Sequence, residues 1–170
     1  MSVPLRCYST SLGCPKNRVD TERLLGSLGV ALVPVESPDE AELVFINTCA
    51  FIQPATEESV RTIAQAIADI EDLPKRPLLA VAGCLVGRYH AEDLAPELPE
   101  VDLWLDNSDL EEWPAMLARK LGLPEPTVPG RILSTGPSYA WLKISDGCRH
   151  ACSFCAIPNI RGGHRSHCKD

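Results

Sequence analysis

The sequence lacks any apolar run long enough to cross a membrane. Its longest apolar stretches, such as LLAVAGCLVG at residues 78–87, fall far short of the roughly 20 residues that a membrane-spanning helix needs. The first ten residues, MSVPLRCYST, also lack the basic start and apolar centre of a secretory signal peptide. We therefore expect a soluble, cytoplasmic protein that does not associate with membranes.

Two common nucleotide-binding motifs are missing as well. No Gly-x-Gly-x-x-Gly sequence follows the first apolar segment, and the 170 residues contain no Gly-Lys-Ser/Thr loop. Both motifs use glycine-rich turns to bring backbone N–H groups against phosphates. Their absence argues against a dinucleotide-binding domain and against a P-loop nucleotidase.

Positive charge is scarce in the first 140 residues. This part holds 21 of the 23 Asp and Glu residues but only 11 of the 16 Lys and Arg residues. An acidic domain argues against generic binding to nucleic acid and is compatible with a basic partner, although a solvated acidic surface is the commoner explanation.

Short apolar segments alternate with helical patterns along the chain, which is typical of strand–helix units around a parallel sheet. Helices are predicted from Pro15 to Gly29, over residues 54–73, and after a capping box formed by Ser108 and Glu111. We expect an α/β fold with a doubly wound, flavodoxin-like parallel sheet of five strands in the order 2-1-3-4-5. The predicted strands are residues 5–12, 30–35, 43–48, 78–83 and 101–106.

A stretch rich in proline and glycine, residues 123–138, predicts a linker between two domains. The first domain is then residues 1–122, and residues 139–170 are the start of a second, incomplete domain. In this second part, YAWLKI at residues 139–144 alternates like a strand and leads into a group of cysteines.

Three cysteines of the first domain each follow a predicted strand directly. They are Cys14 in STSLGC, Cys49 in VFINTC and Cys84 in LAVAGC. The carboxyl ends of parallel strands meet at one edge of the sheet, where such folds bind ligands, so these thiols should converge. Nearby helix starts favour thiolates, the form that iron and zinc bind. Cys7 has no such placement and is expected in the core.

The second group of cysteines is Cys148, Cys152 and Cys155, in the spacing C-x3-C-x2-C. Three thiols so close together predict one metal centre, and a four-iron four-sulfur cluster with three protein ligands leaves one iron open for another molecule. The competing interpretation is a zinc ion with Cys168, His164 or His167 as the fourth ligand. Paired Cys-x2-Cys knuckles are more usual for zinc than a gap of three.

These motifs together resemble the methylthiotransferase family of radical S-adenosylmethionine enzymes. The resemblance rests on SLGCPKNRVDTE (11–22), INTCAFI (46–52), AGCLVGRY (82–89) and LKISDGCRHACSFCAIPNIRGGHRS (142–166). It implies that residues 1–122 are the N-terminal methylthiotransferase domain and that residues 139–170 begin a radical S-adenosylmethionine barrel, of which only the first strand and cluster loop are present. We therefore expect the 170-residue chain alone to be inactive.

The resemblance also implies cofactors and ligands. Cys148, Cys152 and Cys155 would hold the cluster that binds S-adenosylmethionine and generates a radical, with electrons from a low-potential donor. Cys14, Cys49 and Cys84 would hold a second four-iron four-sulfur cluster that handles the inserted sulfur. No side chain is assigned a catalytic role, because the cofactors supply the reactivity.

The motif forms Gly-Cys-Pro-Lys-Asn and Cys-Ser-Phe-Cys-Ala-Ile-Pro resemble the branch of the family that modifies the β-carbon of an aspartate in small-subunit ribosomal protein twelve. Two alternatives stay open at this stage. One is a transfer-RNA methylthiotransferase with the same chemistry and a different acceptor. The other is a non-catalytic metal-binding fragment.

Overall fold

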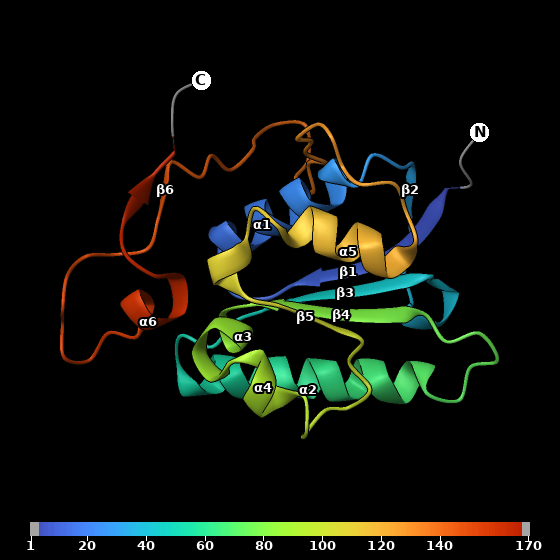
Figure 1. Ribbon diagram of the computed structural model, residues 1–170, viewed down its shortest axis with the longest axis horizontal. Helices are drawn as coiled ribbons and strands as arrows, with labels where there is room; N and C mark the ends of the chain where they lie inside the picture. The colour runs from blue at the N-terminus through green and yellow to red at the C-terminus, as the bar shows by residue number, and fades with distance from the viewer. Residues whose placement is uncertain (1–3, 168–170) are drawn as a thin grey trace.

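The computed structural model describes residues 4–167 and has a central parallel sheet covered by helices on both faces (Figure 1). The strand order is β2-β1-β3-β4-β5, and every neighbouring pair is parallel. The predicted α/β class and the order 2-1-3-4-5 are therefore confirmed. The strands are β1 (Leu5–Ser11), β2 (Leu32–Pro34), β3 (Leu43–Thr48), β4 (Leu78–Gly83) and β5 (Leu103–Leu105).

Helices α1 and α5 cover one face of the sheet, and α2, α3 and α4 cover the other (Figure 1). Each face has its own hydrophobic cluster, because the central strand β3 is buried on both sides and directs alternate side chains to opposite faces. The helices are α1 (Pro15–Ser27), α2 (Gln53–Ile70), α3 (Cys84–Tyr89), α4 (Ala91–Leu94) and α5 (Trp113–Leu121).

One local prediction in this domain fails, and two short helices were missed. The capping box of Ser108 and Glu111 does not form: the Asp106 carboxylate accepts a hydrogen bond from the Ser108 N–H and caps a short 3-10 turn, and α5 begins only at Trp113. The helices α3 and α4 were not predicted, because each is shorter than two turns and shows no helical period.

The chain after α5 holds a small antiparallel pair and one short helix. Strand β6 (Ser145–Asp146) pairs with β7 (Arg165–Ser166), and α6 (Ile157–Arg161) lies between them in the sequence. Residues 139–144 form no strand, so the prediction for YAWLKI was wrong; the neighbouring strands that would pair with it do not occur in residues 4–167. In Figure 1, α6 lies beside α3, at the carboxyl edge of the main sheet.

The segment expected to be a linker, residues 123–138, packs on α1. The Glu22 carboxylate of α1 accepts hydrogen bonds from Arg131 Nη2 at 2.7 Å and from the Ser134 backbone N–H at 2.8 Å. A side chain at Gly130 would collide with the backbone oxygen of Gly26, so α1 and this segment touch backbone to backbone. The domain limits at 122 and 138 stay a prediction. Within residues 4–167, every helix is too short or too polar to traverse a bilayer.

Candidate metal centres

The structure brings Cys14, Cys49 and Cys84 to the carboxyl edge of the sheet, where the ends of β1, β3 and β4 lie side by side. Cys14 precedes the first residue of α1, and Cys84 is the first residue of α3. Cys49 lies four residues before α2, so it has no helix start beside it. The Ser59 hydroxyl instead fixes its backbone, donating to the Cys49 carbonyl at 2.7 Å and accepting from the Cys49 N–H at 3.0 Å.

Glycine allows the three cysteine loops to approach one another. Gly13 has φ +85°, and a Cβ there would lie 2.7 Å from Cys49 Cβ and 2.8 Å from Cys49 Sγ. Gly83 has φ +99°, and a Cβ there would lie 2.6 Å from the Thr48 carbonyl oxygen. Both positions need the left-handed freedom of glycine and its lack of a side chain. The loops that carry Cys14 and Cys84 are therefore held directly against the loop that carries Cys49.

The side chain of Asn17, on α1, contacts all three of these loops. Its amide Nδ2 donates to the Leu12 carbonyl at 2.9 Å and to the Thr48 carbonyl at 2.8 Å, and its Oδ1 lies 3.8 Å from Cys84 Sγ. Leu12 and Thr48 lie just ahead of Cys14 and Cys49 in the sequence. One fully buried side chain thus fastens all three cysteine-bearing strand ends.

The thiol environments differ in a way that separates ligands from core. Burial raises the pKa of the Cys84 thiol; the Arg161 guanidinium opposes this, while the nearby Cys49 and Cys14 add to it. Burial alone raises the pKa of Cys7 to about 12, with no opposing charge. Cys7 is 4% exposed and belongs to a core cluster, as predicted. Cys84 therefore has a cation that opposes the effect of burial, as a metal-binding thiol requires, whereas the burial of Cys7 is uncompensated.

Within residues 4–167, no three His, Cys, Asp or Glu side chains converge tightly enough to share a single metal ion. A single structural zinc ion needs four ligands around one point. An iron-sulfur cluster has a different requirement, because each thiolate binds its own iron at a separate corner. The three thiols at the sheet edge, with the Arg161 guanidinium near Cys84, fit a cluster of this kind.

The second cysteine group forms an open loop between β6 and α6. The Cys148 N–H donates to the Gly162 carbonyl at 3.1 Å, and the Cys155 N–H donates to the Cys152 carbonyl at 3.1 Å. Cys152 is exposed, while Cys148 and Cys155 are partly buried. Phe154, which lies between Cys152 and Cys155 in the sequence, is 91% exposed. Of the histidines proposed for zinc, His164 is exposed, and Cys168 lies outside the described residues.

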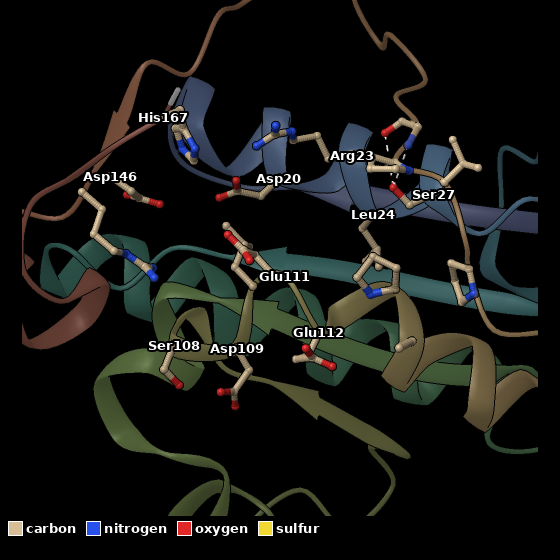
Figure 2. Close-up of a pocket in the computed structure, with 18 of the residues that line it drawn as sticks. Asp20, Arg23, Leu24, Ser27, Ser108, Asp109, Glu111, Glu112, Asp146 and His167 are labelled. Carbon is tan, nitrogen blue, oxygen red and sulfur yellow. Dashed lines mark hydrogen bonds between the residues drawn. The ribbon is translucent and has the colours of Figure 1, made fainter. Parts of the chain in front are cut away.

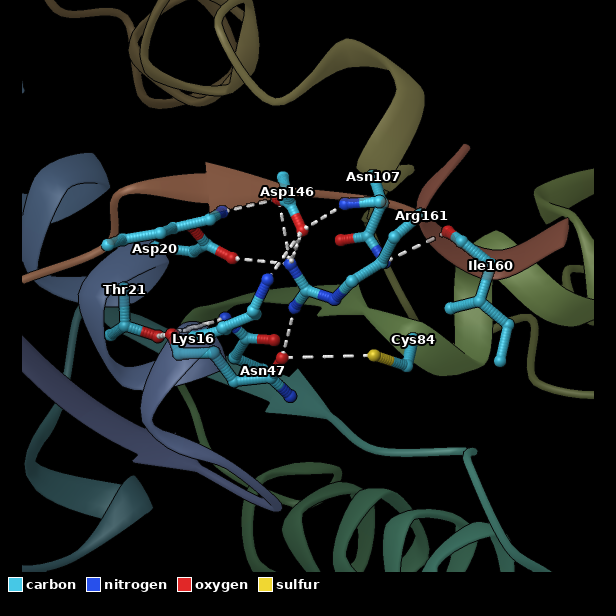
Figure 3. Close-up of polar contacts among 12 residues, drawn as sticks. Lys16, Asp20, Thr21, Asn47, Cys84, Asn107, Asp146, Ile160 and Arg161 are labelled. Carbon is cyan, nitrogen blue, oxygen red and sulfur yellow. Dashed lines mark hydrogen bonds and ion pairs between the residues drawn. The ribbon is translucent and has the colours of Figure 1, made fainter. Parts of the chain in front are cut away.

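A buried ionic network joins this loop to α1 (Figure 3). Lys143 Nζ lies 2.5 Å from an oxygen of Asp20 and 2.5 Å from an oxygen of Asp146. Arg161 Nη1 lies 3.2 Å from Asp20 and 3.0 Å from Asp146. All four side chains are at most 8% exposed. Although burial opposes its charge, the pKa of Arg161 is raised by Cys84, Asp20 and Asp146, so this guanidinium is permanently charged.

Sequence reasoning missed the polar residues that connect the two cysteine groups. Asn17, Asp20 and Thr21 are polar, yet they are buried on α1 beside the apolar positions Val19 and Leu24. Their spacing at i, i+3 and i+4 places them on one face of a helix. A polar stripe within an otherwise buried helix is a signal that could have identified them.

A groove of about 780 Å³ opens next to the network, between α1, the start of α5 and residues 126–130 (Figure 2). It contains none of the six candidate cysteines. Asp20 and Asp146 reach it from the network, and His167 lies beside them. Its other acidic residues are Asp109, Glu111 and Glu112, and its basic ones are Arg23 and Arg165. Since Asp20 and Asp146 are paired with Lys143 and Arg161, the acidic excess of the groove is small.

Comparison with known proteins identifies the family of proteins that has this fold and these cysteines at the edge of the sheet. Residues 6–106 match the family described as "Uncharacterized protein family UPF0004". Because this match covers more than half of the chain, the protein belongs to that family.

Its relatives include several ribosomal protein uS12 methylthiotransferases, named RimO. The chain is 72% identical over 159 residues to the RimO of Nitratidesulfovibrio vulgaris, which is 94% of the chain and 37% of that protein. It is 56% identical over 170 residues to that of Lawsonia intracellularis and 48% identical over 159 residues to that of Aquifex aeolicus. These alignments cover 99% and 92% of the chain, and 39% and 34% of the two relatives. The methylthiotransferase resemblance is confirmed, and the chain spans little more than a third of each relative.

Proposed function

We propose that this chain is the cluster-binding part of a ribosomal protein uS12 methylthiotransferase. In this function two four-iron four-sulfur clusters and S-adenosylmethionine serve to attach a methylthio group to the β-carbon of an aspartate in uS12. The isolated 170-residue span is expected to hold the clusters without completing the reaction. As an enzyme that modifies a ribosomal protein, it would act in the cytoplasm.

The observation that carries this proposal is that both cysteine groups are held at the carboxyl edge of the same sheet. Cys14, Cys49 and Cys84 lie at the ends of three adjacent parallel strands, and the loop of Cys148, Cys152 and Cys155 is tied to the same edge through the buried network around Arg161. A radical and a sulfur source must both reach one acceptor carbon. Two incomplete cluster sites at one edge of one sheet meet that need.

The first group of residues has the chemistry to hold a cluster. Cys14, Cys49 and Cys84 would bind three irons, and three protein ligands leave the fourth iron available for sulfur. Asn17 holds their loops in register. Burial of Cys84 limits the access of water to this side of the site.

The second group would hold the cluster that binds S-adenosylmethionine. When bound, that cluster supplies the electron that generates a carbon-centred radical, chemistry that no side chain can perform. Cys148, Cys152 and Cys155 provide the ligands from a loop that is anchored at both ends, by β6 and by α6. The exposure of Cys152 leaves this side of the loop open to a small molecule and to an electron donor.

The acceptor suggested by charge is a basic protein. The groove beside Asp20 and Asp146 is lined by more acidic than basic side chains, and it opens close to the network that joins the two cysteine groups. Ribosomal proteins are generally basic, whereas a transfer RNA would be repelled by the first 140 residues, which hold 21 Asp and Glu against 11 Lys and Arg. This favours uS12 over a transfer RNA as the acceptor.

A chimaera tests the proposal. The span aligned here would replace the matching 159 residues of the Nitratidesulfovibrio vulgaris RimO. The purified chimaera, reconstituted anaerobically with iron and sulfide, would be incubated with S-adenosylmethionine, a reductant and uS12. We expect a mass gain corresponding to one methylthio group on one aspartate of uS12, detected by peptide mass spectrometry.

Matched cysteine variants provide the control. Cys14→Ala in the chimaera should abolish the modification, and Cys7→Ala should retain it, because only Cys14 lies at the sheet edge. A parallel incubation with transfer RNA measures the alternative acceptor. A modified nucleoside together with unmodified uS12 would overturn the assignment of the acceptor.

A further inference from the structure

Arg161 is the last residue of α6, and its side chain is only 4% exposed. Its guanidinium bonds in two directions. On one side Nη1 lies 3.1 Å and 3.0 Å from the two carboxylate oxygens of Asp146, and 3.2 Å from Asp20. On the other side Nη2 donates to Oδ1 of Asn17. Arg161 therefore connects the loop of the second cysteine group to Asn17, which holds the loops of the first group.

The same Asn17 oxygen also faces Cys84. Cys84 Sγ lies 3.8 Å from Asn17 Oδ1, so the thiol and the guanidinium share one acceptor atom. Figure 3 shows Arg161 reaching toward Asp146 and toward the side where Cys84 lies. A buried positive charge from one cysteine loop is thus fixed beside a candidate iron ligand of the other.

We propose that Arg161 is a positioning residue that couples the two cluster sites. It holds the Cys148 loop against Asn17 and places a positive charge beside the cluster held by Cys84. This inference rests on the proposed function, because it requires a cluster at Cys14, Cys49 and Cys84.

The shape of arginine explains why it occupies this position. Its planar guanidinium presents donors in a fixed fork, so one group can bond carboxylates on one side and an amide oxygen on another. Two lysines also pair with these carboxylates: Lys143 Nζ contacts Asp20 and Asp146, and Lys16 Nζ lies 3.7 Å from Asp146. Among the described residues Lys143 has no hydrogen bond to Asn17 or Cys84. Of the cations in this network, Arg161 is the one that hydrogen-bonds the Asn17 side chain beside Cys84.

A fixed positive charge has a predictable effect on a nearby cluster. Reduction adds negative charge to the cluster, and a buried cation stabilises the reduced form more than the oxidised form. Arg161 should therefore raise the midpoint potential of the first cluster. Asp20 offsets part of this charge, since its carboxylate is fully buried and lies against both Arg161 and Lys143.

The experiment measures that midpoint directly. The 170-residue chain would carry alanine at Cys148, Cys152 and Cys155, so that only the first cluster forms on anaerobic reconstitution. A redox titration followed by electron paramagnetic resonance would compare the parent with Arg161→Gln, Arg161→Lys and Lys143→Met. We expect Arg161→Gln to shift the midpoint to a more negative potential, Arg161→Lys to restore most of the parent value, and Lys143→Met to shift it much less.

For a second variant, Asp20→Asn, we expect the midpoint potential to shift in the opposite direction. The test then does not depend on Arg161→Gln folding correctly. Asp20→Asn keeps the size of the side chain and removes one of the anions that face Arg161. The net charge beside Cys84 becomes more positive, so the midpoint should move to a less negative potential. A purely structural role for the network would give no such reversal of sign.

The possible outcomes distinguish the role of Arg161 from the proposed function of the chain. Iron bound in the parent, with the Arg161→Gln and Asp20→Asn midpoints equal to that of the parent, would overturn the role of Arg161 and leave the proposed function standing. No iron in the parent would overturn the proposed function and this inference with it. Opposite shifts in Arg161→Gln and Asp20→Asn would establish the inference.

Discussion

The Arg161 guanidinium donates a hydrogen bond to the Asn17 side-chain oxygen across 144 residues of sequence. Asn17 fastens the strand ends that carry Cys14, Cys49 and Cys84, and Arg161 follows the loop that carries the second cysteine group. This one contact makes the geometry of each cysteine group depend on the other. The structure thus links the two cysteine groups through Asn17 and Arg161.

Asn17→Ala should weaken both the fold and the first cluster site. The substitution leaves the buried carbonyls of Leu12 and Thr48 without their donor, which should lower the free energy of unfolding by about 3 kcal/mol. Iron at the first site should fall as well, because the cysteine loops lose their common anchor. Asn159→Ala is the control, since Asn159 is exposed on α6 and its loss should cost less than about 0.5 kcal/mol. Urea unfolding and iron analysis would measure the two effects.

Comparing Gly13→Ala with Gly122→Ala distinguishes backbone strain from crowding at the cysteines. The new Cβ would lie 2.7 Å from Cys49 Cβ, so the loop must move and iron bound at the first site should decrease. Gly122→Ala is matched to it, because Gly122 has φ +69° but open space around its Cβ position. Both variants should lose about 1 kcal/mol of stability from the positive φ. Equal iron contents in the two variants would show that Cys14 and Cys49 do not act together.

Alkylation of the metal-free chain should distinguish the thiols. Cys7 is 4% exposed and burial raises its pKa to about 12, so it should stay unmodified by iodoacetamide at pH 8 in the folded protein. Cys14 and Cys152 are exposed and should react first. Peptide mass spectrometry over a time course would give the order. Reaction of Cys7 before Cys14 would contradict the assignment of Cys7 to the core.

Stability should fall in acid partly through Glu22. Although burial opposes ionisation, hydrogen bonds from Ser134 and the charge and hydrogen bonds of Arg131 lower the pKa of Glu22 below its ordinary value. A carboxyl with a depressed pKa stabilises the fold above its unfolded pKa, near about 4.3, and this contribution disappears as the pH falls through the folded-state pKa. Glu22→Gln should therefore lose stability at pH 7 and show a flatter acid dependence below about pH 4.3. Urea unfolding at a series of pH values would measure both slopes, and parallel curves for parent and variant would contradict the role of Glu22.

Much of the fold follows from the sequence because its signals are local. The apolar segments 43–48 and 78–83 are strands, and the inward positions Val19, Leu24 and Leu28 are buried as the helical period requires. Residues 139–144 were misread because an alternating pattern forms a strand only when a neighbouring strand pairs with it. In the described part of the chain no such neighbour exists.

One part of the candidate site could likewise be predicted from the sequence, and another part could not. Cys14, Cys49 and Cys84 could be placed at one edge because strand order alone fixes where their strands end. The contacts of Arg161 with Asn17 and Asp20 could not be predicted, because they join residues more than 100 positions apart. Spacing in a sequence carries no information on which buried donor meets which buried acceptor.

The most direct test of the central claim is the iron content of the 170-residue chain after anaerobic reconstitution with iron and sulfide. Two four-iron clusters predict about eight irons per chain, falling to about four in Cys84→Ala and to about four in Cys148→Ala. Cys7→Ala should leave the count unchanged. A chain that binds one zinc ion and no iron would contradict the account.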